Sequence, residues 1–205
     1  MTVRAFIQAR MSSARFPGKV LAPFRGEPVV LHAVRAATAA VGEDAVVVAT
    51  STAPSDDPLC AYLDSIGVAV VRGPLDDVFE RFRLAARTHP CDWMLRLTAD
   101  SPLLDPEVLR RVVAAGAGSA ADLVTTTSPR TYPKGMNAEL IRVETLQRID
   151  AAELDDDDRE HVTRFFYRHP ARFTIVNVES GDPALAEHDL SVDTVDDLRR
   201  LEAGA

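Results

Sequence analysis

The chain alternates short apolar runs with longer amphipathic stretches, and this alternation most strongly limits the folds open to it. The apolar runs are rich in Val and Ile and nearly continuous, which is typical of strands covered on both faces in a mainly parallel sheet. The stretches between them have the length of connecting helices, so the pattern predicts βαβ units. We therefore expect an α/β fold, a three-layer α/β/α sandwich with a mainly parallel sheet. The expected strands are Val3–Gln8, Ala45–Ala49, Val68–Val71, Trp93–Thr98, Asp122–Thr126 and Phe173–Val178, and the expected helices are Pro28–Val41, Asp57–Ile66, Leu75–Thr88, Pro106–Ala115 and Arg159–Arg168.

Length and composition narrow the class of protein further. A chain of 205 residues suits a single domain spanning 1–205. No apolar run approaches the ~18 residues that a membrane helix needs, and the N-terminus does not resemble a secretory signal, so we expect no membrane partner. Two cysteines, Cys60 and Cys91, do not make a disulfide framework. We therefore expect a cytoplasmic protein.

Charge is distributed unevenly along the chain. Residues 1–41 carry six Lys or Arg and one acid, whereas the remainder carries 17 basic and 30 acidic residues, for a total of −8. An acidic protein lacks the broad basic face that nucleic-acid binding needs, so we expect no nucleic-acid partner. A basic segment within an acidic chain indicates instead a site for one small anionic ligand.

Lysine is rare in this chain and arginine common. Of 23 basic residues only Lys19 and Lys134 are lysines, and both lie in segments that contain Gly and Pro. A retained Lys supplies a compact point charge of the kind that suits a phosphate. Chance in an Arg-rich composition is the alternative explanation.

The segment after the first strand, Gln8–Lys19, combines three cations, two hydroxyls and a glycine within 12 residues. Ligands of open α/β sheets bind beyond the carboxyl ends of the strands, where this segment is expected to lie. Arg can bind phosphate oxygens through two parallel donors, and small residues let backbone N–H groups approach. The segment matches neither the G-x-x-x-x-G-K-[ST] phosphate loop nor G-x-G-x-x-G. It therefore predicts a triphosphate-binding loop of another kind, with an ordinary exposed basic loop as the alternative.

Several motifs, in order along almost the whole chain, resemble those of the cytidylyltransferase family, which includes the synthetases of CMP-activated acidic sugars such as sialic acid and Kdo. The spore-coat-polysaccharide branch of that family is the most similar. The motifs are Ile7–Ser13 with Arg15–Leu21, Asp76–Val78, Arg96–Leu103, Pro133–Gly135 with Glu139, Arg159–Thr163, and Ser191–Thr194 with Asp197.

The resemblance implies a Rossmann-like fold of the nucleotide-diphospho-sugar transferase type and Mg²⁺-dependent transfer of CMP from CTP to a small acidic acceptor, an ulosonic-acid type of sugar, with release of pyrophosphate. Such an enzyme would act in surface-polysaccharide or glycoconjugate biosynthesis. The catalytic residues would be Arg10, Lys19 and Asp100, and the nucleotide-binding residues Gln8, Ala9, Arg10, Ser12, Ser13, Arg15, Lys19, Thr50 and Thr98.

Asp100 ends an expected strand, and the family likeness makes it a metal ligand. Asp193, after the strand-like stretch Leu190–Val192, would be the second ligand. Mg²⁺ commonly takes one or two carboxylates together with substrate phosphate oxygens, so two would suffice. Each aspartate has an alternative role as the cap of the helix that follows.

A second group of polar residues is implied for the acceptor. Arg159 has an alternative role as a partner for the acidic run Asp155–Asp158, which we expect to be a solvated helix start. On one continuous helix Arg159 and Thr163 would share a face. The implied acceptor residues are Lys134, Asn137, Glu139, Arg159 and His161.

Other functions stay open. The acceptor could be a phosphonate or a polyol phosphate. A glycosyltransferase of related fold that uses a nucleotide sugar is another class, but residues 92–105 offer only Asp100 at the strand end and no Asp-x-Asp. A noncatalytic nucleotide sensor is a third class, disfavoured because the charged groups occur together. The family likeness also suggests a homodimer, although the short stretch Ser128–Met136 leaves little room for a dimerisation arm.

Overall fold

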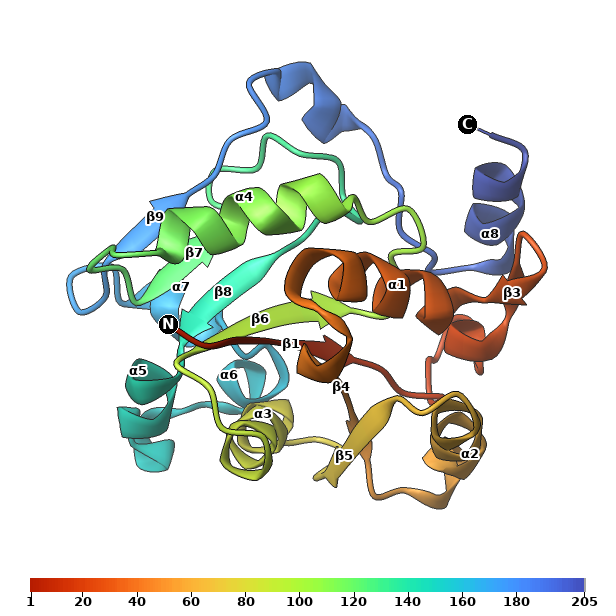
Figure 1. The fold of residues 1–205 in the computed structure, drawn as a ribbon, viewed down its shortest axis with the longest axis horizontal. Helices are drawn as coiled ribbons and strands as arrows, with labels where there is room; N and C mark the ends of the chain where they lie inside the picture. The colour runs from red at the N-terminus through yellow and green to blue at the C-terminus, as the bar shows by residue number, and fades with distance from the viewer. Residues whose placement is uncertain (205) are drawn as a thin grey trace.

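The expected strands come together in one seven-stranded sheet of the computed structural model, which describes residues 1–204. The strand order is β5-β4-β1-β6-β8-β7-β9, and all strands run in one direction except β8 (Figure 1). The mainly parallel sheet predicted from the sequence is confirmed. The strands are β1 (Val3–Gln8), β4 (Val46–Ser51), β5 (Ala69–Gly73), β6 (Trp93–Thr98), β7 (Leu123–Thr125), β8 (Glu139–Arg142) and β9 (Ile175–Asn177), with a separate hairpin of β2 (Pro23–Phe24) and β3 (Glu27–Pro28).

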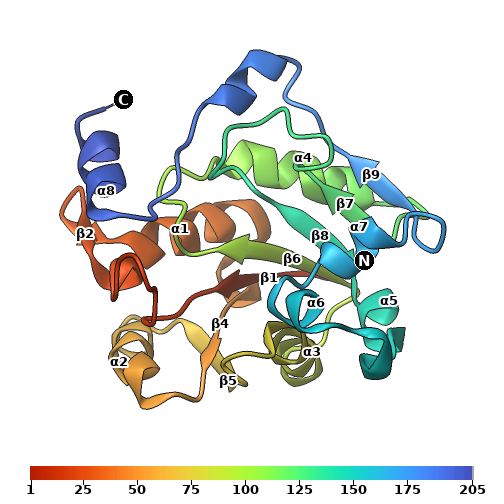
Figure 2. The same cartoon turned by 180° about the vertical axis from the view of Figure 1, so that it is seen from behind.

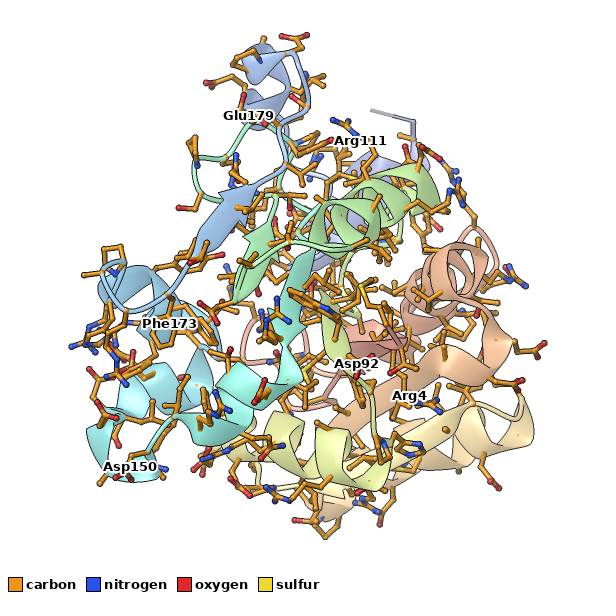
Figure 3. All side chains as sticks on the ribbon, turned by 60° about the vertical axis from the view of Figure 1, so that its left-hand side comes forward. Arg4, Asp92, Arg111, Asp150, Phe173 and Glu179 are labelled. Atoms are coloured by element: carbon orange, nitrogen blue, oxygen red, sulfur yellow. The ribbon has the colours of Figure 1, made fainter. Side chains whose placement is uncertain are left out.

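Helices cover both faces of the sheet, as the three-layer prediction requires (Figures 1 and 2). Buried side chains of α1, α2 and α4 form the core on one face, and those of α3, α5 and α7 form the core on the other, where Phe173, labelled in Figure 3, packs on Phe166. The helices are α1 (Val29–Val41), α2 (Asp57–Ser65), α3 (Val78–Thr88), α4 (Pro106–Gly116), α5 (Val143–Arg148), α6 (Asp156–Glu160), α7 (Arg164–Arg168) and α8 (Val195–Glu202), with short 3-10 helices η1 (Lys19–Leu21), η2 (Glu43–Ala45), η3 (Pro54–Asp56), η4 (Ala151–Glu153) and η5 (Pro183–Glu187).

Strand β8 was missed by the sequence reasoning. It lies between β6 and β7 and is antiparallel to both. An antiparallel neighbour needs no crossover helix, so the strand–helix alternation gave no sign of it. The four residues of β8 also begin with Glu139 and end with Arg142, so the two apolar residues between them are too few to form a recognisable apolar run.

The single helix expected over Arg159–Arg168 is wrong. Helix α6 ends at Glu160 and α7 begins at Arg164. The break lets Arg164 and Arg168 turn back onto Asp158, whose carboxylate has no exposed surface and accepts from both guanidinium groups at 2.7 Å. The acidic run therefore starts a helix, as expected, but it is not wholly solvated.

The break also separates two residues that were expected to share a helix face. Arg159 donates to Asp77 at 2.7 Å, whereas Thr163 is buried and donates to Glu139 at the same distance. Arg159 therefore forms an ion pair, but with Asp77 and not with the acidic run that the alternative named.

The C-terminal segment reaches the carboxyl end of the sheet by way of a small apolar core. Leu190–Val192 is not a strand, and only an isolated bridge joins Lys134 to Asp189. Val192, Leu198 and Leu201 bury themselves against Phe24 and Val29, so α8 lies beside the β2–β3 hairpin (Figures 1 and 2). Burial of this apolar stripe brings residue 193 next to the segment Gln8–Lys19 that follows β1, which we call the first loop.

We predict that Gly135→Ala destabilises the protein by about 3 kcal/mol, measured by urea unfolding. Gly135 has φ +96°, and an added Cβ would lie 2.7 Å from the Leu190 carbonyl carbon. The control is Gly181→Ala, at φ +88° with open space around it, which we expect to cost about 1 kcal/mol. Equal losses for the two variants would show that the close approach to Leu190 contributes nothing.

Candidate active site

A cleft of about 410 Å³ opens at the carboxyl ends of β1 and β6. Arg4 and Asp92, labelled in Figure 3, mark the opposite edge of the sheet, at the amino ends of the same two strands. The cleft thus lies where open α/β sheets bind their ligands. Its lining is Gln8, Ala9, Arg10, Ser13, Ala14, Arg15, Lys19, Val20, Thr98, Ala99, Asp100, Glu160, His161 and Asp193.

The first loop is folded back on itself by backbone hydrogen bonds. Ser13 and Gly18 both donate their N–H groups to the Met11 carbonyl, at 3.0 and 2.8 Å. Gly18 supplies the left-handed φ of 76° that the turn into η1 requires. Lys19 is the first residue of η1, so the turn sets the place from which its side chain enters the cleft.

Asp56 fixes the start of this loop through hydrogen bonds to its carboxylate. Its buried carboxylate accepts from the Met11 N–H at 2.7 Å, from the Thr50 hydroxyl at 2.9 Å, and from both the N–H and the hydroxyl of Ser51. Burial raises the pKa of Asp56, but these hydrogen bonds together lower it by more, so the pKa of this carboxyl is lower than usual. The Asp56 side chain does not cap α2, although Asp56 directly precedes that helix.

The Lys19 ammonium lies between two carboxylates. It donates to Asp100 Oδ2 at 2.8 Å and to Asp193 Oδ1 at 3.0 Å, residues that are 81 and 174 positions away in the chain. A third hydrogen bond goes to the Val192 carbonyl at 2.8 Å, and the Lys19 side chain is 12% exposed. The structure thus brings together the three groups that the sequence analysis picked out from distant motifs.

Asp193 receives two further cations. Arg15 lies 3.1 Å from its Oδ2, and Lys134 lies at the same distance from that oxygen while also pairing with Asp189 at 2.9 Å. Burial raises the pKa of Asp193, but the hydrogen bonds from Lys19 and Lys134 outweigh it, and the pKa is lower than usual.

The helix-cap alternatives for the two aspartates do not hold. Asp105 caps α4 by accepting from the Glu107 N–H. Thr194 caps α8 in a capping box with Asp197. The carboxylates of Asp100 and Asp193 are therefore directed to the lysine rather than to a helix terminus.

The cleft is balanced in charge, although the segment that the sequence predicts to bind a triphosphate carries only cations. Its lining carries three cations, Arg10, Arg15 and Lys19, and three carboxylates, Asp100, Glu160 and Asp193. Arg10 lies 3.7 Å from Glu160, so each cation has an acidic neighbour. Anion binding at this site must therefore reorganise existing ion pairs.

Most of the expected nucleotide-binding residues line the cleft, but Thr50 and Ser12 do not. Thr50 has no exposed surface and its hydroxyl is used by Asp56, so its side chain cannot face a base. The prediction for the Thr50 side chain is wrong because the end of β4 is covered by η3. Ser12 is exposed and is not among the residues that line the cleft.

The expected acceptor residues are spread over several places. Asn137 and Glu139 line a pocket of about 140 Å³ that adjoins the cleft at Thr98. His161 lines the cleft itself, whereas Lys134 lies on Asp189 and Asp193. Arg159 lines a third hollow of about 270 Å³ with Arg10 and Asp77. The expected acceptor residues therefore do not form one pocket. Lys134 lies instead beside the carboxylates of Asp189 and Asp193.

Arg96 is a residue of the small pocket to which the sequence analysis gave no role. It donates to Glu139 Oε2 at 2.5 Å and to Gln8 Oε1 at 2.7 Å, and so joins the small pocket to the cleft. Glu139 also accepts from Thr163 and Tyr167. Burial and the nearby Glu139 charge raise the pKa of Tyr167, which stays a neutral donor. A lone Arg inside the apolar run Trp93–Thr98 was the available signal.

The residues present fit one divalent cation bound with substrate oxygens. Asp100 and Asp193 already share a single cationic group, with oxygens 2.8 and 3.0 Å from it. Within residues 1–204 no group of three or more His, Cys, Asp or Glu side chains could hold a metal alone. Two carboxylates completed by phosphate oxygens is a coordination that Mg²⁺ commonly adopts.

The fold and the cleft together define an α/β protein with a ligand-binding site at the carboxyl edge of its sheet. Residues 5–197 match the family described as cytidylyltransferase. The chain is 32% identical to the spore coat polysaccharide biosynthesis protein SpsF of Bacillus subtilis, over 96% of this chain and 83% of that protein. It is 33% identical to a 3-deoxy-manno-octulosonate cytidylyltransferase of Anaeromyxobacter, over 73% of this chain and 60% of that one.

A solved cytidylyltransferase from Leptospira borgpetersenii superposes with a TM-score of 0.93 at 28% identity, covering 99% of this chain and 86% of that one. The chain belongs to the cytidylyltransferase family and is a CTP-dependent nucleotidyltransferase. None of the helices in residues 1–204 combines the length and apolar character needed to cross a membrane.

We predict that Asp56→Asn lowers the free energy of unfolding by about 2 kcal/mol at pH 7, because the amide leaves buried donors unpaired. The folded pKa of Asp56 lies below the ordinary 3.8, so its contribution is complete above that pH and is lost as the pH falls through the folded value. The difference between wild type and variant should therefore shrink in acid, measured by chemical unfolding across pH. Asp57→Asn, at an exposed neighbour, should change stability by less than about 0.5 kcal/mol; an equal loss there would contradict the role of Asp56.

Proposed function

We propose that this protein is a Mg²⁺-dependent cytidylyltransferase that transfers CMP from CTP to an acidic sugar of the ulosonic type and releases pyrophosphate. The observation that carries this proposal is the cationic group shared by Asp100 and Asp193 beside the Arg10–Arg15 loop. The similarity to a relative named for 3-deoxy-manno-octulosonate and to one named for spore coat polysaccharide supports the acceptor class and a role in surface-glycan synthesis. A cytoplasmic location and a homodimer stay predictions.

Transfer requires an acceptor oxygen to attack the α-phosphorus in line while pyrophosphate leaves. Arg10, Arg15 and Lys19 bind the triphosphate and neutralise the charge that collects on the leaving pyrophosphate. Gln8, Ala9, Ser13 and Thr98 contact the nucleoside and α-phosphate side of the cleft. Asp100 and Asp193 would hold Mg²⁺, which would supply Lewis-acid polarisation of the phosphorus and of the attacking oxygen. The protein thereby contributes mainly position and fixed charge.

The acceptor extends from the cleft toward the small pocket in this proposal. Arg130 donates to Asn137 at 2.7 Å and has no carboxylate within ion-pair distance in residues 1–204, so its charge is available to an acidic group. Glu139 is fixed by Arg96, Thr163 and Tyr167 and offers an acceptor to a sugar hydroxyl. His161, which is exposed, lines the cleft beside Glu160.

We predict that Asp100→Asn lowers the rate of Mg²⁺-dependent pyrophosphate release from CTP by about 10³-fold, with the fold intact. The matched control is Asp189→Asn, whose carboxylate pairs with Lys134 but does not contact Lys19. It should keep the rate within about tenfold of wild type. Near-normal turnover by Asp100→Asn would remove that residue from the metal site.

The acceptor is tested in the same assay. An ulosonic acid should stimulate pyrophosphate release. If only a phosphonate or a polyol phosphate stimulates it, the acceptor belongs to that class and not to the ulosonic acids. Formation of a glycosyl product from a nucleotide sugar without pyrophosphate would contradict the proposed reaction.

A further inference from the structure

The Lys19 ammonium has no hydrogen left for a phosphate. An ammonium carries three N–H donors, and all three are used, by Asp100, Asp193 and the Val192 carbonyl. The lysine that neutralises the triphosphate must therefore give up at least one of these partners when the nucleotide binds. This conclusion follows from the hydrogen bonds of Lys19 within the chain and uses no contact with a ligand.

The same contacts occupy the oxygens that a divalent cation needs. Lys19 is bonded to Asp100 Oδ2 and Asp193 Oδ1, and Asp193 Oδ2 is within ion-pair distance of both Arg15 and Lys134. A metal ion that approaches these carboxylates alone meets a partly buried positive charge between them, and at this distance two like charges repel strongly. The carboxylates likewise repel a free polyphosphate.

We infer that Lys19 is an exchange residue: its ammonium takes the place of the divalent cation between Asp100 and Asp193 in the free enzyme and moves to the triphosphate when metal and nucleotide bind together. The inference rests on the metal site of the proposed function. Each partner removes the obstacle to the other, because the triphosphate draws Lys19 away from the carboxylates and the metal replaces it there. Lys19 thus couples the two binding events and disfavours each ligand alone.

The structure provides the movement that this exchange requires. Lys19 lies at the start of the short helix η1, and its four-carbon stem can redirect the ammonium while the backbone stays fixed by the Gly18 turn. The backbone of the C-terminal segment does not depend on Lys19 alone, because the Val192 N–H donates to the Asp100 carbonyl at 2.8 Å. Asp100 and Asp193 therefore stay adjacent after the ammonium leaves.

The test is the affinity for Mn²⁺ without nucleotide, measured by electron paramagnetic resonance of the free ion. Lys19→Met should bind Mn²⁺ about tenfold more tightly than wild type or better, because a nearby positive charge is removed. Lys19→Arg retains the charge and should stay within about threefold of wild type. Arg15→Met is the matched control, because Arg15 contacts Asp193 but not Asp100 and is 67% exposed, so its charge is screened. It should also gain less than about threefold.

The second measurement is the same titration with saturating CTP. In wild type CTP should strengthen Mn²⁺ binding, and the ratio of the two affinities should fall in Lys19→Met by about the factor gained without nucleotide. Thermal midpoints of the variants near that of wild type establish that they are folded. Lys19→Met binding Mn²⁺ no more tightly than wild type, or no more tightly than Arg15→Met, would overturn the exchange.

The two proposals fail in different ways. Absence of any CTP effect on Mn²⁺ affinity in wild type contradicts the proposed nucleotide and metal site, and the exchange with it. A clear CTP effect in wild type, together with unchanged Mn²⁺ affinity in Lys19→Met, contradicts the exchange alone.

Discussion

The ammonium of Lys19 joins three parts of the chain that the sequence keeps far apart: the first loop, the end of β6 and the segment before α8. Two carboxylates that contact the same ammonium repel each other at neutral pH, and the Lys19 cation offsets that repulsion. The cost of desolvating the group is limited, because the lysine and both aspartates keep some exposed surface. Because these charged groups are paired with one another in the absence of a ligand, a ligand can bind here only by rearranging the ion pairs.

Apolar packing determines where these charged side chains lie. The stripe of α8 buries itself with the β2–β3 hairpin, and Gly135 lets the Lys134 loop approach the backbone of Leu190 and Ser191. Asp56 fixes the other end of the first loop through the Met11 N–H. None of these contacts touches the cleft, yet together they determine where Lys19 and Asp193 meet. Loss of packing there should therefore affect the site as directly as loss of a charge.

Local patterns were enough to predict much of the fold. The apolar runs predicted β1, β4, β5 and β6 to within a few residues, and the position of Gln8–Lys19 after β1 placed the first loop at the ligand edge. Tertiary contacts account for what was missed. The break at His161–Thr163 depends on two arginines reaching the buried Asp158, and the burial of Thr50 depends on Asp56. Neither contact leaves a periodic trace in the sequence.

The neighbourhood of Asp100 and Asp193 could not be obtained from spacing. It was implied by the family likeness, and in the structure both carboxylates contact Lys19. The separation of Lys134 from Glu139, by contrast, was not foreseen, because both lie in one short motif. Loop geometry directs Lys134 toward Asp189, whereas Glu139 lies in β8 opposite Arg96 of β6.

The most direct test of the central claim, that this charged cleft is a joint site for CTP and a divalent cation, is the thermal midpoint of unfolding with CTP, UTP, ATP and GTP, each with and without Mg²⁺. The account predicts a clear rise with CTP and Mg²⁺ together, since ligand at 100 times its Kd adds about 2.7 kcal/mol, and much smaller rises with either alone or with the other nucleotides. No rise with any nucleotide, or an equal rise with all four, would contradict it.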